Sequence, residues 1–157
     1  MVSNALGRTS FNRVLLSAAR GPIGRYLKLP VSWVHGEDIA RGCNLALDKG
    51  VAGERYMLAG RPEDIVSIAN ACNRVCRLAG FDHEVVDVEP SDDPELAKVF
   101  GPTLVAIAEK AARARPDRRK LEDSKTYKRL GYSPISLDEG LATTIGWFRE
   151  IGRIDTP

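Results

Sequence analysis

The stretch VSWVHGEDIARGCNLALDKG, residues 31–50, decides the fold, because it joins a strand to a helix. Residues 31–35 are rich in β-branched and aromatic side chains, which are typical of a strand. Glu37 and Asp38 follow in what we expect to be the first helical turn, where negative charge suits the free backbone N–H groups. We expect the buried side of this helix to carry Ile39, Cys43, Ala46 and Leu47.

His35 precedes the two carboxylates closely, which raises the alternative of a catalytic cluster. A strand and the helix after it point in different directions, so His35 and Asp38 are not expected to act as a dyad. No second imidazole follows at helical spacing to complete a metal site. We interpret the cluster as a structural joint.

Outward from this joint, short strands alternate with amphipathic helices. We expect strands at 53–60 and 83–90, and a helix at 63–79 that Gly80 closes. Residues 94–115 have a helical pattern interrupted at Gly101-Pro102. A helix near the N-terminus is capped by Thr9 or Ser10, is stopped by Gly21-Pro22, and has one apolar face of Phe11, Val14, Leu15, Ala18 and Ala19.

Two short helices are expected near the C-terminus. Asp123 can cap the first, which ends at Leu130-Gly131. Ser136 and Glu139 have the spacing of a capping box at the start of the second, which Gly152 ends. The apolar face of that second helix consists of Leu137, Leu141, Ile145, Phe148 and Ile151.

Composition is that of an ordinary soluble globular protein. The 157 residues are 43% hydrophobic and 28% charged, which fits one domain spanning residues 1–157. No apolar run approaches the roughly 20 residues of a membrane helix. The net charge of +2 makes nucleic acid an unlikely partner. Three unpatterned cysteines favour a reducing cytoplasm, and Cys72 and Cys76 fit an apolar helical stripe better than a metal site.

Two basic segments allow a functional alternative. The first 36 residues contain no acid and several arginines and serines, as organellar transit peptides do, although we favour a native helix there. The run RARPDRRK, residues 113–120, lacks interleaved aromatics, so a solvated helix end and loop is the preferred interpretation. The alternative is a non-catalytic interaction module that uses this run.

Three motifs resemble the extended short-chain dehydrogenase/reductases, the NAD-dependent epimerase/dehydratase family. Residues 31–60 are similar to its strand, acidic-capped helix and Gly-Glu-x-Tyr segment. Residues 125–152 are similar to its C-terminal Leu-Gly-Tyr-x-Pro turn and final helix, and SNALGRTSFN, residues 3–12, resembles the loop beside the nicotinamide. The general character is closer to the dihydroflavonol reductase-like and hydroxysteroid dehydrogenase-like branches than to nucleotide-sugar epimerases. The resemblance implies an α/β fold: the mostly helical, substrate-binding C-terminal part with a few short strands, and the Rossmann half missing.

Two family motifs are absent from the sequence. The nearest match to the glycine-rich cofactor loop is Gly21-Pro-Ile-Gly24, which follows a helix where the family has a strand. None of the four tyrosines is followed by lysine at the fourth position, so Tyr-x-x-x-Lys is missing. We therefore assign no catalytic residue and no metal ligand, and we expect the chain alone to be inactive and to bind no cofactor.

The resemblance implies a part of an NAD(P)-dependent oxidoreductase, epimerase or dehydratase that binds a small carbonyl or alcohol substrate. It places Ser3 and Asn4 on the nicotinamide side, with NAD or NADP as the family's cofactor. Arg8, Phe11 and Asn12 follow toward the substrate. The alternative is a subunit of a split reductase completed by a separate chain. Strand edges left open at 31–35 and 55–59 predict a homodimer, or pairing with the missing nucleotide-binding half.

Overall fold

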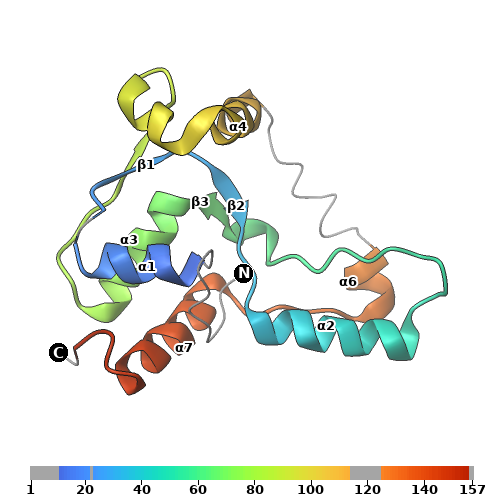
Figure 1. The fold of residues 1–157 in the computed structure, drawn as a ribbon. Coiled ribbons are helices and arrows are strands. Elements are labelled where there is room, and N and C mark those ends of the chain that lie inside the picture. The colour runs from blue at the N-terminus through green and yellow to red at the C-terminus, as the bar shows by residue number, and fades with distance from the viewer. Residues whose placement is uncertain (1–10, 22, 114–124, 156–157) are drawn as a thin grey trace.

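The computed structural model describes residues 11–21, 23–113 and 125–155 (Figure 1). It is an α/β structure, mostly helical with a few short strands, as the sequence predicts. In chain order the elements are α1 (Phe11–Ala19), β1 (Arg25–Leu27), β2 (Pro30–Ser32), α2 (Gly36–Lys49), the 3-10 helix η1 (Pro62–Asp64), β3 (Ile65–Ser67), α3 (Ile68–Ala79), β4 (Val86–Val88), α4 (Pro94–Arg113), α6 (Lys125–Leu130) and α7 (Leu137–Glu150).

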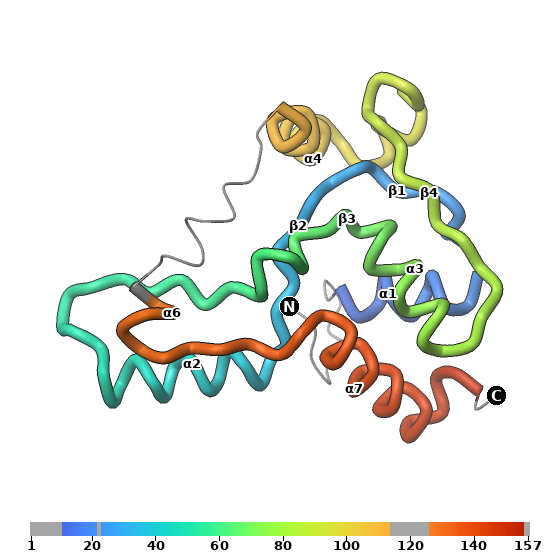
Figure 2. Tube along the Cα trace, turned by 180° about the vertical axis from the view of Figure 1, so that it is seen from behind, coloured from blue at the N-terminus to red at the C-terminus, as the bar shows by residue number. Residues whose placement is uncertain are grey.

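The strands form two small sheets within the described part of the chain. β1 pairs with β4 in parallel, with Tyr26 opposite Asp87. β2 pairs with β3 antiparallel, with Val31 opposite Val66. Because β1 and β2 are joined by only two residues, the two sheets lie next to each other, and α4 lies beside this junction in both views (Figures 1 and 2).

The main core surrounds α3, which packs against both α1 and α7 (Figure 2). The apolar stripe of α3 is buried, including Cys72 and Cys76, so the prediction that these thiols belong to the core is confirmed. No cluster of metal-binding side chains occurs among the described residues. Burial raises the pKa of the Cys72 thiol to about 12, as expected for a thiol in apolar surroundings.

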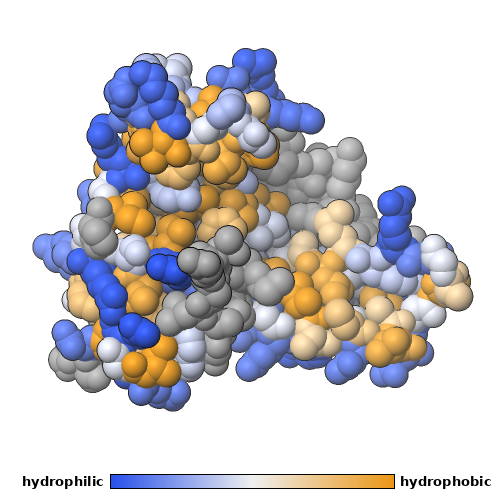
Figure 3. All heavy atoms as spheres, in the orientation of Figure 1, coloured by the Kyte–Doolittle hydropathy of each residue, from blue (hydrophilic) through white to orange (hydrophobic). Residues whose placement is uncertain are grey.

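The prediction for the buried side of α2 is wrong for Cys43 and Leu47, whereas Ile39 and Ala46 are half-buried. Cys43 is exposed and the side chain of Leu47 is 83% exposed, whereas Asp38 and Gly42 are buried. The reason is close packing at Gly42, where an added Cβ would lie 2.5 Å from the side chain of Leu58. A larger residue there would force the Leu58 side chain to move, so the helix keeps its glycine inward. Cys43 and Leu47 are left exposed, on a lobe where Figure 3 shows apolar residues gathered.

The strand expected at 53–60 is also absent; the segment is extended but pairs with no strand among the described residues. Side chains of α6 supply its partners instead. The backbone N–H of Met57 donates to Thr126 Oγ1 at 2.9 Å, and the Tyr127 hydroxyl donates to the Gly60 carbonyl at 2.8 Å. These bonds satisfy backbone groups that a neighbouring strand would otherwise have to pair.

The helix expected at 63–79 begins later, at Ile68. Residues 62–64 form η1 and residues 65–67 form β3, because this piece pairs with β2. Ser67 then caps α3 by accepting a hydrogen bond from the Asn70 N–H at 3.1 Å, and Gly80, with φ of 80°, ends α3 as predicted. The strands predicted at 31–35 and 83–90 are present only as the shorter β2 and β4.

Other local signals are confirmed. Helix α1 buries Leu15, Ala18 and Ala19, and α4 is kinked at Gly101, whose φ of 78° is not helical. Helix α7 carries the complete capping box of Ser136 and Glu139, and its apolar face is buried except for Ile151. The predicted caps at Thr9, Ser10 and Asp123 lie outside the described residues.

The joint after β2 is structural. His35 is the N-cap of α2, and its Nδ1 accepts a 3.4 Å hydrogen bond from the Glu37 N–H. Asp38 is buried, forms an ion pair with Arg41 and accepts a hydrogen bond from the backbone N–H of Ile135 at 3.1 Å. The two side chains therefore have separate partners and form no dyad.

None of the helices built from the described residues is long and apolar enough to cross a membrane.

Candidate substrate-binding groove

A groove of about 420 Å³ lies where the two sheets, the start of α3 and the end of α4 meet. Its size is within the range of small-molecule pockets. Its lining consists of Lys28, Pro30, Ile65, Val66, Ser67, Asn70, Asp87, Glu89, Ala111 and Ala112. Aliphatic side chains thus alternate with a few polar groups, an arrangement that can hold and orient a small organic molecule.

Ser67 joins the two sheets at the groove. Its hydroxyl donates to Asp87 Oδ2 at 2.5 Å and accepts from the Asn70 N–H at 3.1 Å. The side-chain oxygen of Asn70 in turn accepts from Arg74 Nε at 3.1 Å. This chain of hydrogen bonds fixes the positions of the polar groups. Because these side chains are already ordered, binding a ligand does not cost the entropy of ordering them.

A second polar pair lies on the β1 and β4 side. Lys28 Nζ lies 2.8 Å from Glu89 Oε1, and this hydrogen bond to Glu89 raises the pKa of Lys28. Since Lys28 is paired with Glu89, the carboxylate of Asp87 gives the described lining a net negative charge. This described part of the groove therefore favours a neutral ligand that can donate a hydrogen bond over a phosphate group.

The polar groups of the groove can bind and orient, but they do not form a proton-transfer pair of the Tyr-x-x-x-Lys kind. The nearest tyrosine in sequence, Tyr26 of β1, packs edge to face on Phe100 with ring centroids 4.6 Å apart. Its pKa is raised chiefly by burial, which opposes the phenolate form. The described side chains thus supply a binding surface.

Of the site residues expected from the sequence, only Phe11 and Asn12 are among those that the structure describes. Ser3, Asn4 and Arg8 are outside the described residues, so their assigned roles stay predictions. Phe11 packs edge to face on Trp33 at 5.3 Å between ring centroids, and Asn12 is completely buried at the start of α1. Neither lines the groove. Of the basic run, residues 114–120 are likewise not described, and the interaction-module alternative stays a prediction.

The polar residues of the groove were missed by the sequence reasoning, although one signal was present. In VVDVEP, residues 85–90, Asp87 and Glu89 alternate with valines and must share one face of a strand. That pattern indicates a polar strand face. The pattern cannot indicate that Ser67 is the partner of Asp87, because that contact depends on how the two sheets are placed relative to each other.

Comparisons with known proteins give distant matches, and no protein-family model matches the chain. Over 150 residues the chain is 24% identical to sterol demethylase protein B of Methylococcus capsulatus, covering 90% of this chain and 45% of that protein. Over 117 residues it is 26% identical to dTDP-glucose 4,6-dehydratase of Haemophilus influenzae, covering 74% of this chain and 31% of that protein.

A solved structure has a similar fold. The crystal structure of gox2253 superposes with a TM-score of 0.65 and 26% sequence identity, covering 94% of this chain and 46% of that one. The chain spans less than half the length of each of these relatives. Together these matches support a coarse, distant relation to oxidoreductase-type and dehydratase-type proteins.

Proposed function

We propose that this chain is the substrate-binding part of an NAD(P)-dependent oxidoreductase, epimerase or dehydratase of the extended short-chain dehydrogenase/reductase type. The observation that carries the proposal is the groove between the two sheets, with its fixed Ser67–Asp87 hydrogen bond. The distant relation to enzymes of those classes supports it. In this role the groove holds the substrate, and the described residues contribute no catalytic group.

The substrate we propose is a neutral alcohol or carbonyl compound with an apolar body. Ile65 and Val66 supply apolar contact, and Asp87 can accept a hydrogen bond from a hydroxyl group. A sugar nucleotide carries two phosphate charges, which the net negative charge of the described lining disfavours. Between the molecules that the names of the relatives suggest, a sterol therefore fits better than dTDP-glucose.

The test is titration of the 15N-labelled chain with cholesterol carried by cyclodextrin, followed by amide NMR. We expect saturable shifts at Ser67, Asn70 and Asp87, and none of comparable size with dTDP-glucose. The variant Ala112→Phe should block the groove from an exposed position on α4. Ala106→Phe is the matched control, because Ala106 is exposed on the same helix and does not line the groove.

Loss of the shifts in Ala112→Phe but not in Ala106→Phe supports the proposal. Shifts that persist in Ala112→Phe, or that map away from β3 and β4, would contradict it. Binding of dTDP-glucose at the groove with no response to cholesterol would keep the binding role and overturn the substrate class.

We further propose that a nucleotide-binding unit, on the same or another polypeptide, supplies the NAD or NADP. The proposed nicotinamide contacts from this chain are Ser3 and Asn4. Exposed apolar side chains are available for pairing with that unit or with a second copy, since Leu47 and Met57 are 83% and 61% exposed. Light scattering after size-exclusion chromatography tests the homodimer. A monomeric chain contradicts it, and a dimer that Leu47→Glu leaves intact excludes self-association through Leu47.

A further inference from the structure

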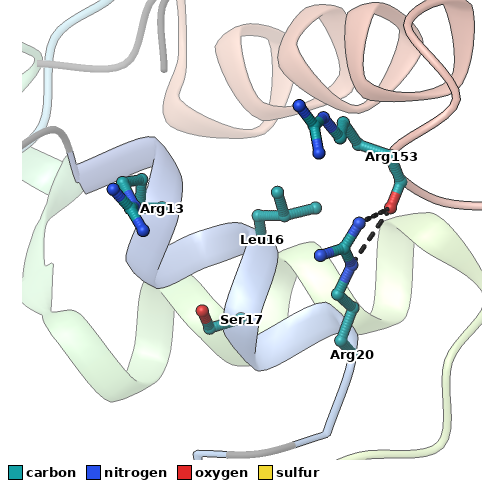
Figure 4. A pocket seen from close by; sticks show the side chains of 5 residues that line it. All are labelled: Arg13, Leu16, Ser17, Arg20 and Arg153. Carbon is teal, nitrogen blue, oxygen red and sulfur yellow. Dashed lines mark hydrogen bonds between the residues drawn. The ribbon is translucent and has the colours of Figure 1, made fainter. Parts of the chain in front are cut away.

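A second cavity, of about 290 Å³, lies between α1 and the turn that follows α7 (Figure 4). Its lining consists of Arg13, Leu16, Ser17, Arg20 and Arg153. Figure 4 shows the three arginines arranged around Leu16. Arg13 lies on α1, Arg20 follows the end of α1, and Arg153 lies across from them. The described part of the lining contains three guanidinium groups and no acidic side chain.

Arg20 is held in place by the backbone opposite. Its Nε and Nη2 donate to the Arg153 carbonyl at 3.1 and 2.6 Å. This pair of bonds ties the end of α1 to the turn after α7 and fixes one wall of the cavity. The carbonyl carries no net charge, so the positive charge of Arg20 is not neutralised by it.

No comparable hydrogen bond within the described residues explains the position of the Arg13 side chain. It lies in the first turn of α1, where the helix dipole disfavours positive charge, and that turn contains no acid. Within residues 11–21, 23–113 and 125–155, neither Arg13 nor Arg153 forms an ion pair. Three like charges facing one cavity repel each other unless an anion joins them.

We propose that Arg13, Arg20 and Arg153 form a binding site for the phosphate group of a small soluble molecule. Guanidinium groups match phosphate oxygens with paired N–H donors, and the hydroxyl of Ser17 adds a further donor at the cavity wall. The cavity can hold more than a single phosphate, which fits a pyrophosphate or a phosphorylated metabolite. This site shares no residue with the groove and has the opposite charge.

The experiment is titration of the chain with inorganic pyrophosphate at constant ionic strength, by calorimetry and by amide NMR. We expect saturable binding with a dissociation constant below about 1 mM and shifts at Arg13, Ser17 and Arg153. Arg13→Gln and Arg153→Gln should each weaken binding at least about tenfold. Arg55→Gln is the charge-matched control, because Arg55 is exposed and makes no described ion pair.

Arg55→Gln should bind like the original chain, and added salt should weaken binding. No saturable binding of pyrophosphate, or equal affinity in Arg13→Gln and Arg55→Gln, overturns the proposal. A chain that binds phosphatidylglycerol vesicles but not free pyrophosphate overturns it as well, since the anion source is then a lipid surface. The Ala112→Phe variant should retain pyrophosphate binding, which separates this site from the groove.

Discussion

Asp64 caps helix α7 from a distant part of the chain: its Oδ2 accepts a hydrogen bond from the backbone N–H of Leu137 at 2.8 Å. Its other oxygen lies 3.5 Å from Nη1 of Arg74, which also reaches Asp138 at 3.1 Å. Asp64 is buried, and this network joins η1, α3 and α7.

Asp64→Ala should lower the free energy of unfolding by about 1–3 kcal/mol, because it leaves the buried Leu137 N–H and Arg74 without this carboxylate. Urea unfolding followed by circular dichroism measures the change. Asp82→Ala is the control; Asp82 is exposed and makes no described hydrogen bond, so we expect a change within about 0.5 kcal/mol. Equal changes in the free energy of unfolding for the two substitutions would show that the hydrogen bond and ion pair of Asp64 do not stabilise the fold.

Two glycines should respond to alanine in opposite directions. A Cβ on Gly60 would lie 1.5 Å from the Trp33 carbonyl oxygen, so Gly60→Ala should cost about 3 kcal/mol or more. Gly146 lies inside α7 with nothing within 4 Å of its added Cβ, so Gly146→Ala should stabilise by about 0.5–1 kcal/mol. The melting temperatures of both variants test the pair. A Gly60→Ala variant with the melting temperature of the original chain would refute the close contact.

The three cysteines should react at different rates with a thiol reagent such as DTNB. Cys43 is exposed, whereas Cys72 and Cys76 are buried and burial raises the pKa of both thiols. At pH 8 we expect one fast thiol, which Cys43→Ser removes, and two that react only on unfolding. Three fast thiols in the folded chain would contradict the core position of α3.

Glu139 should make stability depend on acid pH. Hydrogen bonds from Ser136 lower its pKa in the folded chain. Its stabilising contribution is therefore complete above the pKa of the unfolded chain and is lost as the pH falls through the lower, folded value. Glu139→Gln should narrow the difference between melting temperatures at pH 7 and pH 3. Glu150→Gln, exposed at the end of the same helix, should leave that difference unchanged.

Signals that act within a few residues were predictable from the sequence. Ser136 and Glu139 form their capping box, and Gly80 ends α3, because the partners lie in the same turn of chain. The burial of Cys72 was likewise predictable, since helical spacing places it within one apolar stripe. In each case the geometry of one helix is sufficient.

Features that depend on distant contacts were not predictable. Residues 53–60 have a strand-like composition, but their partners are Thr126 and Tyr127 from α6. The exposed side of α2 could not be foreseen either, because the close contact of Gly42 with Leu58 and Tyr132 decides which face turns inward. The groove depends on the meeting of Ser67 and Asp87, which lie in different sheets.

The parallel pairing of β1 with β4 also affects the order in which the chain can fold. The chain from β2 to α3 lies between the two strands, so we expect their hydrogen bonds to form only after that intervening chain has compacted. Helices α3 and α7, stabilised by local bonds, can form earlier. In pulsed hydrogen exchange during refolding, we expect the amides of Tyr26 and Val88 to gain protection after those of α3, and simultaneous protection would contradict this order.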